Sequence, residues 1–466
     1  MLVDVRSRGA ATRIEGPLLF LRRTVNAGLN DAVEVIDEQG RKRLGRIATL
    51  DEDSMIIEVL ESTSGLSLAN TTVRFMGEAL HFGVGPDLLG RVLDGVGRPL
   101  DNGPPVSSTR HLRIDGLAIN PAARAYPRDF IETGISSIDL MNSLVRGQKL
   151  PIFSGSGLPH DRIATEIARH AKLLGEEEGS FAVVFVAIGV SYDIAEQFRR
   201  AMESSGALEH TVLFLNLASD SSTQRLLAPR YALTAAEYLA YSEDRHVLVI
   251  LTDMTNYCEA LREVSASHSE IPSRKGYPGY MYSDLATLFE RAGCITGKAG
   301  TLTQLPILTI PSDDITHPIP DLTGYITEGQ IVLDRELDRR DVYPPVRVLP
   351  SLSRLMKDGT GRGYTHEDHP ALANQLYAAY ARATHVRVLA SIMGSEGLSE
   401  DDQLFLDFGD RFEQELLHQD SARSLEQSME IGWRLLQHIP ALELTRLNDE
   451  QIRRYIKDEA GDSAGQ

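Results

Sequence analysis

The chain has 466 residues, which corresponds to about three domains at roughly 150 residues each. Its 47 basic and 66 acidic residues give a formal net charge of −19 at pH 7, which disfavours an electrostatic binder of nucleic acid or anionic membrane. The longest apolar stretch, Phe181–Val190, is far shorter than the roughly 18 residues of a membrane span, and the N-terminus lacks an apolar signal segment. We therefore expect a cytoplasmic protein whose partners are proteins and small ligands.

The first part of the chain contains short runs of alternating apolar and polar residues, separated by turn residues. We predict strands at 32–36, 43–50, 54–60 and 71–75. Strands at such even spacing indicate a small β-barrel over residues 1–75. A connector rich in Gly and Pro follows, from Gly83 to Pro105.

From about Leu150 the pattern changes to buried strand runs that alternate with helical stretches. The predicted strands are 181–188, 211–216, 247–252 and 307–310, and the predicted helices are 162–174, 224–241 and 282–291. Alternation of this kind indicates a parallel sheet covered on both faces. We assign residues 76–350 to this α/β domain.

After Pro350 the strand signals stop and helical periodicity takes over. Leu404, Phe408, Phe412 and Leu416 recur every four residues behind Ser399, which predicts an amphipathic helix with a buried face. A capping pair of Ser424 and Gln427 opens a second helix that contains Trp433. Residues 351–466 are therefore predicted to form a helical bundle.

The segment LPIFSGSGLPHD, at 150–161, joins an apolar strand to a helix through small residues. A parallel-sheet nucleotide binder keeps its phosphate loop at this position. When the pattern G-x-x-x-x-G-K-[ST] is placed on this segment, the loop comprises Ser154, Gly155, Ser156 and Gly157. The last three positions then hold Pro159, His160 and Asp161.

These three residues remove the chemistry of a phosphate loop. Pro159 has no N–H to donate, and His160 is shorter than lysine and mostly neutral at pH 7. Asp161 adds a negative charge, and at roughly 4 Å its repulsion of a phosphate costs about 4 kcal/mol, whereas the helix N-terminus returns only about 0.3 to 1 kcal/mol. We predict a self-capped helix start, with Pro159 in the first turn, that binds nucleotide weakly or not at all.

Four segments together resemble one family. They are SGSGLPH at 154–160, VILTDMTNYC at 249–258, GYPGYMYSDLA at 276–286 and PSLSRLM at 350–356. They are similar to the B (beta) subunit of V/A-type rotary ATPases. The resemblance implies a multi-domain α/β fold with an N-terminal β-barrel, a central RecA-like (P-loop NTPase) domain and a C-terminal helical bundle.

The resemblance also implies a non-catalytic, regulatory role. The family's B subunit alternates with three catalytic A subunits in a hexameric ring around a rotating shaft, and a peripheral stalk completes the assembly. The ring couples ATP synthesis or hydrolysis to proton or sodium transport, so the chain would meet the membrane only indirectly, as a peripheral part of the complex. No nucleic-acid partner is implied.

By resemblance, Arg354 supplies an arginine to the ATP site of the neighbouring catalytic subunit. ATP or ADP with Mg would bind at that interface, and no cofactor would be bound tightly by this chain alone. Asp253 follows the strand run at 246–252 as a Walker B-like carboxylate, whereas Val190, at another strand end, cannot act as a base. The segments 271–278 and 311–316 resemble shaft-facing loops.

Two other readings remain open. One is a self-sufficient hexameric RecA-like NTPase, such as a translocase or a secretion motor, which should carry its own phosphate-loop lysine. The other is a scaffold that binds no nucleotide. The pair His366 and His369 invites a metal site, but the spacing is not H-E-x-x-H, so we predict a solvated loop and no metal there.

Overall fold

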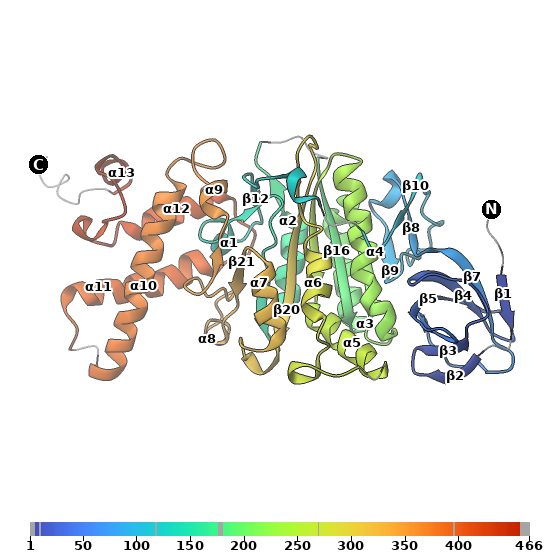
Figure 1. The fold of residues 1–466 in the computed structure, drawn as a ribbon. Coiled ribbons are helices and arrows are strands. Elements are labelled where there is room, and N and C mark those ends of the chain that lie inside the picture. The colour runs from blue at the N-terminus through green and yellow to red at the C-terminus, as the bar shows by residue number, and fades with distance from the viewer. Residues whose placement is uncertain are drawn as a thin grey trace, which may run out of the picture. The chain divides into compact units, whose positions relative to one another are not determined.

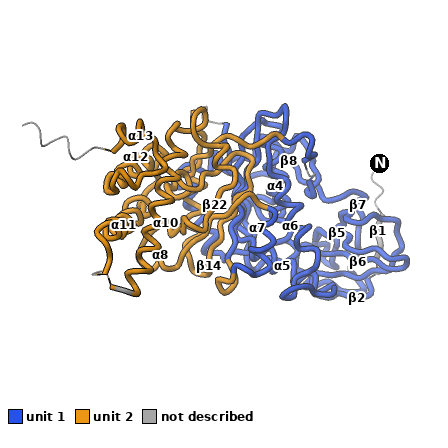
Figure 2. The backbone as a smooth tube through the Cα atoms, turned by 60° about the vertical axis from the view of Figure 1, so that its left-hand side comes forward, with its two compact units in different colours: residues 1–124, 179–309, 315–326 blue, residues 125–178, 310–314, 327–466 orange. Residues whose placement is uncertain are grey.

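The computed structural model describes residues 5–8, 11–116, 119–175, 180–268, 270–394 and 397–456. The chain divides into two compact units (Figure 2). Unit 1 comprises residues 1–124, 179–309 and 315–326, and unit 2 comprises residues 125–178, 310–314 and 327–466. Within the described ranges, no helix is long and apolar enough to cross a membrane.

The predicted N-terminal barrel is an antiparallel sheet at the blue end of the ribbon in Figure 1. Its strand order is β1-β7-β4-β5-β6-β3-β2. The strands are β1 (Val5–Arg8), β2 (Ala11–Glu15), β3 (Leu18–Arg22), β4 (Asp31–Ile36), β5 (Lys42–Leu50), β6 (Ser54–Val59) and β7 (Thr72–Ala79).

Alternation along these strands places their apolar side chains in one core, as the sequence pattern predicts. The core residues are Leu19, Leu21, Val33, Val35, Ile47, Met55, Ile57, Val59, Val73 and Phe75. Strand β7 is longer than the predicted 71–75, because its pairing with β4 extends to Asp31 opposite Ala79. The end of β7 is set by backbone pairing with β4, which the local sequence pattern does not encode.

The rest of unit 1 contains the predicted parallel sheet, in the order β20-β18-β16-β17-β9. All seven residues of β18 are buried, as expected for a strand covered on both faces. A separate antiparallel pair is formed by β8 and β10, which lie at either end of the connector. The strands are β8 (His81–Val84), β9 (Val92–Asp94), β10 (Arg110–Arg113), β16 (Phe181–Val190), β17 (Thr211–Leu217), β18 (His246–Thr252), β19 (Gly293–Ile295) and β20 (Thr301–Ile310).

Helices of unit 1 alternate with these strands, and Figure 1 shows α4 running beside β16. The helix predicted at 224–241 begins two residues earlier, because the Ser221 side chain accepts a hydrogen bond from Gln224 N and caps it. The helices are α3 (Tyr192–Ser205), α4 (Ser222–Tyr241), α5 (Met254–Ser267), α6 (Met281–Phe289) and α7 (Pro318–Ile326).

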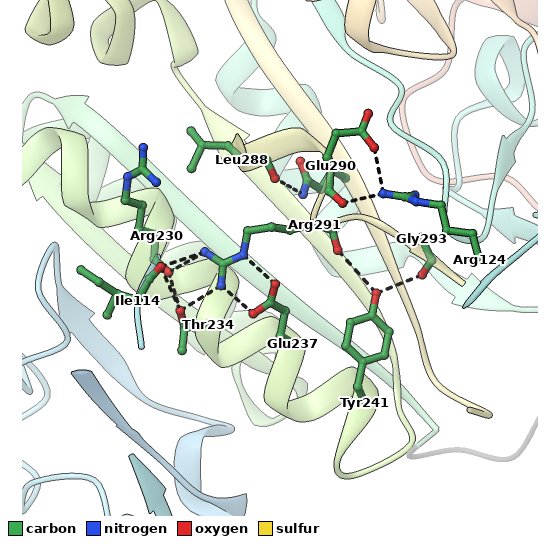
Figure 3. Close-up of polar contacts among 11 residues, drawn as sticks. Ile114, Arg124, Arg230, Thr234, Glu237, Tyr241, Leu288, Glu290, Arg291 and Gly293 are labelled. Carbon is green, nitrogen blue, oxygen red and sulfur yellow. Dashed lines mark hydrogen bonds and ion pairs between the residues drawn. The ribbon is translucent and has the colours of Figure 1, made fainter. Parts of the chain in front are cut away.

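A fully buried arginine ties the loop after β10 to α4 (Figure 3). The Arg291 guanidinium binds the Glu237 carboxylate through two hydrogen bonds of 2.6 and 2.7 Å, and it also donates to Ile114 O and Thr234 Oγ1. Gly116 makes room for it, since a Cβ there would lie 2.6 Å from the guanidinium carbon. One side chain thus satisfies a carboxylate, a hydroxyl and a loop carbonyl in the interior.

Next to it, Arg124 holds the same region from the other side (Figure 3). Its guanidinium donates to Ala292 O at 2.9 Å and to both the carbonyl and the carboxylate of Glu290. The Tyr241 hydroxyl donates to Gly293 O at 3.1 Å. The carbonyls that follow α6 are therefore satisfied by side chains, which anchors the start of β19.

Unit 2 contains two small groups of strands. β12, β13 and β15 form an antiparallel sheet, while β14 pairs parallel with β21, and β21 pairs antiparallel with β22. The strands are β12 (Phe130–Glu132), β13 (Leu144–Val145), β14 (Ile152–Gly155), β15 (Lys172–Leu173), β21 (Gly329–Val332) and β22 (Leu352–Ser353).

Two predictions fail in this part. The helix predicted at 162–174 is α2 (His160–His170). It ends early because Leu173 belongs to strand β15 and pairs with Ile131 of β12. A strand also exists after Pro350, where none was predicted, because Leu352 and Ser353 pair with β21. In both cases pairing with a strand distant in sequence overrides the local helical pattern.

The predicted helical bundle is confirmed in the C-terminal part of unit 2. The capping box of Ser424 and Gln427 is present at the start of α12. Leu404 departs from the predicted buried stripe, since it is 41% exposed while Phe408, Phe412 and Leu416 are buried. The helices are α1 (Ser136–Asp139), α8 (Arg335–Arg339), α9 (Met356–Gly359), α10 (His369–Met393), α11 (Glu400–Arg411), the π-helical turn Phe412–Leu417, α12 (Leu425–Leu436) and α13 (Asp449–Tyr455).

The prediction of a solvated loop at 366–369 is wrong for its last two residues, Asp368 and His369, which are buried. His369 is the first residue of α10 and is completely buried. Its Nε2 lies 3.0 Å from Leu140 O and its Nδ1 lies 3.0 Å from Thr365 Oγ1. Because a carbonyl only accepts, Nε2 carries the proton and Nδ1 accepts from the threonine. His369 is therefore a neutral core histidine.

Candidate functional site

The segment from β14 to α2 has the strand–turn–helix form of a phosphate loop. β14 ends at Gly155, a turn closes with Leu158 N donating to Gly155 O at 3.1 Å, and Gly157 adopts a φ of +83°. Helix α2 starts at His160, so Pro159 is its N-cap and does not lie in the first turn as predicted. Pro159 makes no side-chain capping bond, and of the predicted self-cap only the position of Asp161 in the first turn is present.

The polar side chains of this loop contact one another. His160 Nδ1 lies 3.1 Å from the Oγ of Ser154, which is buried. On the other side of the ring, His160 Nε2 lies 3.7 Å from an Asp161 carboxylate oxygen. Ser156 and Gly157, at the tip, are exposed. The histidine is thus folded back toward the end of β14, where a phosphate-loop lysine would extend toward a ligand.

An ion pair that the sequence does not reveal covers the loop at Gly155. Arg335, the first residue of α8, donates to both carboxylate oxygens of Asp313, at 2.7 and 3.0 Å. A Cβ at Gly155 would lie 2.7 Å from an Arg335 nitrogen and closer still to an Asp313 oxygen. The two hydrogen bonds from Arg335 hold the pKa of Asp313 below its usual value, so this carboxylate is ionised at neutral pH.

Together, these groups do not fit a nucleotide phosphate. Two carboxylates lie at the loop. Asp161 is in the first turn of α2, and Asp313 lies against Gly155 at the end of β14. Asp161 has no lysine beside it in the loop, and its repulsion of a phosphate at roughly 4 Å would cost about 4 kcal/mol, whereas the charge of Asp313 is balanced by Arg335. The amide cradle also lacks the donor that Pro159 cannot supply. The Asp313–Arg335 pair also packs against Gly155 at the strand end of the loop.

Arg354 lies elsewhere in unit 2, directly after the short strand β22. Its backbone N donates to Glu328 O at 3.0 Å, and Glu328 N in turn donates to Lys149 O at 3.0 Å. Arg354 is therefore level with Lys149, six residues before Gly155, which is about 20 Å in an extended strand at roughly 3.3 Å per residue. The predicted arginine lies at the end of β14 opposite to the degenerate loop.

The Arg354 side chain is exposed and makes no hydrogen bond or ion pair with any residue that the structure describes. It borders a pocket of about 460 Å³ that also contains the exposed Lys357. The other walls are largely apolar and include Met141, Leu352, Met356, Pro370, Ala373 and Tyr377. An unpaired guanidinium beside an open pocket is available to a phosphate or carboxylate group from outside the chain.

The carboxylate of Asp253, in unit 1, accepts hydrogen bonds from residues of the same chain. It is the N-cap of α5, and its Oδ1 accepts from Thr255 N at 2.7 Å. Both carboxylate oxygens also bind Thr309, at the backbone N and the hydroxyl. Val190 is buried at the end of β16, in line with the prediction that this strand end carries no base.

Models of three protein families match successive parts of the chain. Residues 11–77 match the beta-barrel domain of the ATP synthase alpha/beta family, and residues 134–353 match the nucleotide-binding domain of that family. Residues 358–456 match the C-terminal domain of V and A type ATP synthase. These matches confirm the predicted fold class of barrel, parallel-sheet domain and helical domain.

Two curated relatives align over almost the whole chain. A V-type ATP synthase beta chain from Halothermothrix orenii is 52% identical over 458 residues, which is 98% of this chain and 98% of that protein. Another from Thermotoga neapolitana is 54% identical over 455 residues, covering 97% and 98%. The chain belongs to the family of V-type ATP synthase beta chains.

A solved structure supports the same fold for this V-type beta chain. The ATP synthase subunit NeqB from Nanoarcheaum equitans aligns with a TM-score of 0.71 and 36% identity, over 90% of this chain and 98% of that one. The family membership confirms the resemblance inferred from the sequence. The motif at 350–356 pointed to Arg354, but no sequence signal pointed to the ion pair of Asp313 and Arg335, since the two residues lie in separate segments and no motif links them.

Proposed function

We propose that this V-type beta chain is the non-catalytic B subunit of a rotary ATP synthase. In this proposal it alternates with three catalytic A subunits in a hexameric ring and contributes Arg354 to their ATP sites. The ring couples ATP synthesis or hydrolysis to the transport of protons or sodium ions. Shaft and peripheral-stalk subunits are its further partners, and the complex holds it at the cytoplasmic face of the membrane.

The observation that carries the proposal is the position of Arg354. Its guanidinium is exposed and unpaired within the described part of the chain, and its backbone is level with Lys149, about 20 Å of extended chain before Gly155 in the segment with the phosphate-loop form. An arginine in this position cannot serve that loop, and it is free to reach a site on a neighbouring subunit. The loop's two carboxylates also argue against nucleotide binding by this chain itself.

Arginine suits this role because its planar, permanently charged guanidinium binds two phosphate oxygens at once. ATP with Mg, bound by the catalytic subunit, would supply the phosphoryl group that reacts. Arg354 would stabilise the negative charge that develops on the phosphate oxygens in the transition state. Arginines that act in this way are worth about 10³ to 10⁵ in rate.

The test is ATP hydrolysis by the reconstituted ring. With Arg354→Ala we expect the ring to assemble, as seen by native mass spectrometry, while turnover falls by about 10³ or more. Arg411→Ala is the matched control, because Arg411 is a partly exposed arginine of the same unit that forms an ion pair with Asp407 in α11. Near-normal turnover with Arg354→Ala would contradict the proposal, as would strong hydrolysis by the isolated chain.

A further inference from the structure

Gln148 holds the backbone segment that carries the Arg354 side chain. Gln148 is completely buried, and its side-chain Nε2 donates to Glu328 O at 3.0 Å. The same carbonyl accepts the backbone N–H of Arg354, also at 3.0 Å. Gln148 and Arg354 therefore share one acceptor, so a shift of the Gln148 amide displaces the group to which Arg354 is bound.

A second path leads through the neighbour of the arginine. Gln148 Nε2 also donates to Ser353 Oγ at 2.9 Å, and this hydroxyl donates to Ser143 O at 2.8 Å. The Gln148 Oε1 accepts from Val145 N at 3.0 Å. Both donors and the acceptor of the amide are thus used, and its orientation is determined by three partners.

Other contacts hold the residues just before the arginine. β22 has only two residues, Leu352 and Ser353, and it pairs with β21. Ser351 Oγ accepts from Val332 N at 2.9 Å, while the Leu352 side chain is 54% exposed. The Glu328 side chain is anchored by Lys149. Lys149 Nζ lies 2.9 Å from Glu328 Oε1, and Lys149 N donates to Oε2 at 2.8 Å.

We infer that Gln148 is a positioning residue for Arg354, acting through Ser353 and the Glu328 carbonyl. This inference rests on the proposed role of Arg354. Gln148 is buried and would not touch the nucleotide. Its hydrogen bonds set the position of the Arg354 backbone and so of the attached guanidinium. A misplacement of about 1 Å at a reacting group can cost about a hundredfold in rate.

A double-mutant cycle in the reconstituted ring tests the inference. The four rings carry the unchanged chain, Gln148→Leu, Arg354→Ala, and both substitutions, and kcat and KM for ATP hydrolysis are measured for each. Leucine keeps most of the volume of glutamine but has no amide. We expect Gln148→Leu to lower kcat by about ten- to a hundredfold with KM changed less than about threefold. In the Arg354→Ala background the same substitution should change kcat by less than about twofold.

Gln419→Leu is the matched control, because Gln419 is an equally buried amide of unit 2 that bonds to Gly134 O and Ser136 N and to no residue near Arg354. It should lower the melting temperature in a similar way and leave kcat nearly unchanged. Should Gln148→Leu fail to fold, Ser353→Ala removes one of the two paths at little cost in volume. It should lower kcat severalfold, again only when Arg354 is present.

The outcomes separate the inference from the proposed function. If Arg354→Ala abolishes turnover but Gln148→Leu and Ser353→Ala do not lower kcat, the positioning role is rejected and the proposed function stands. Losses that multiply in the double variant also reject it, because Gln148 would then act independently of Arg354. If Arg354→Ala leaves turnover near normal, the proposed function fails first and the positioning role fails with it.

Discussion

Arg335 and Asp313 form a bidentate ion pair, at 2.7 and 3.0 Å, that packs directly against the backbone of Gly155. The degenerate phosphate loop is therefore altered twice. Its own sequence lacks the lysine, and a carboxylate from another segment lies where the loop backbone would face a ligand. The second alteration changes what is expected when the loop sequence is restored.

Restoring the loop by Pro159→Gly, His160→Lys and Asp161→Thr should strengthen ADP binding by the isolated chain only modestly. Asp313 stays in place against Gly155 and keeps Arg335 engaged in the ion pair. Adding Asp313→Ala should improve the affinity by a further tenfold or more, about 1.4 kcal/mol, because it removes the charge and leaves Arg335 free to bind an anion. Titration calorimetry of both variants measures this. Equal affinities would show that Asp313 does not obstruct the loop.

Removing the buried arginine of Figure 3 should destabilise unit 1 strongly. Arg291→Met leaves the Glu237 carboxylate and Ile114 O without their donor, and breaking a buried pair costs about 3 to 5 kcal/mol. Thermal unfolding of the isolated chain checks this. Arg199→Met on α3, which breaks an exposed pair with Glu196, should leave the melting temperature nearly unchanged.

A second substitution sharpens this prediction. In the variant that combines Arg291→Met with Glu237→Leu, the carboxylate that lost its partner is also gone. The double variant should then be more stable than Arg291→Met alone, because an unpaired buried charge is more costly than its absence. A double variant that unfolds at a lower temperature than the single one would contradict this account of the network.

Burial of His369 should make the chain lose stability in acid. Burial lowers the pKa of His369 to about 4, while an unfolded histidine titrates near 6.5. Between about pH 6.5 and pH 4 the unfolded state binds a proton that the folded state refuses, so stability falls as the pH falls through this window. At pH 5 the loss is about 2 kcal/mol.

The measurement compares unfolding at pH 7.5 and pH 5 for the unchanged chain and for His369→Gln, which can still donate to Leu140 O. Other groups titrate too, so the difference between the two proteins isolates His369. The variant should lose less stability between the two pH values. His438→Gln, at an exposed histidine, should not alter the pH dependence. The same acid sensitivity in His369→Gln would rule out this histidine as the cause.

Asp253 should prove to be a structural residue of unit 1. Asp253→Ala removes the cap of α5 and both bonds to Thr309, which should cost about 1 to 3 kcal/mol. Asp253→Asn keeps a carbonyl oxygen for the cap and should recover most of this loss, as measured by the melting temperature. If asparagine were as destabilising as alanine, the negative charge itself would be required at this position.

The sequence alone determined the elements and the family. Apolar periodicity located the barrel strands β4 to β7, buried strands of the parallel sheet and the bundle, and the capping residue Ser424 marked a helix start, because these signals lie within a few residues of the structures they specify. The loss of phosphate-loop chemistry could also be read from contiguous residues, since Pro159, His160 and Asp161 replace consecutive positions of one motif.

Only the tertiary structure decided the contacts between segments distant in sequence. It showed Asp313 and Arg335 against Gly155, Gln148 beside Ser353, and His369 against Leu140. It also ended α2 early and exposed Leu404. Strand pairing and burial of this kind depend on which distant residues meet in space, and local periodicity carries no information on that.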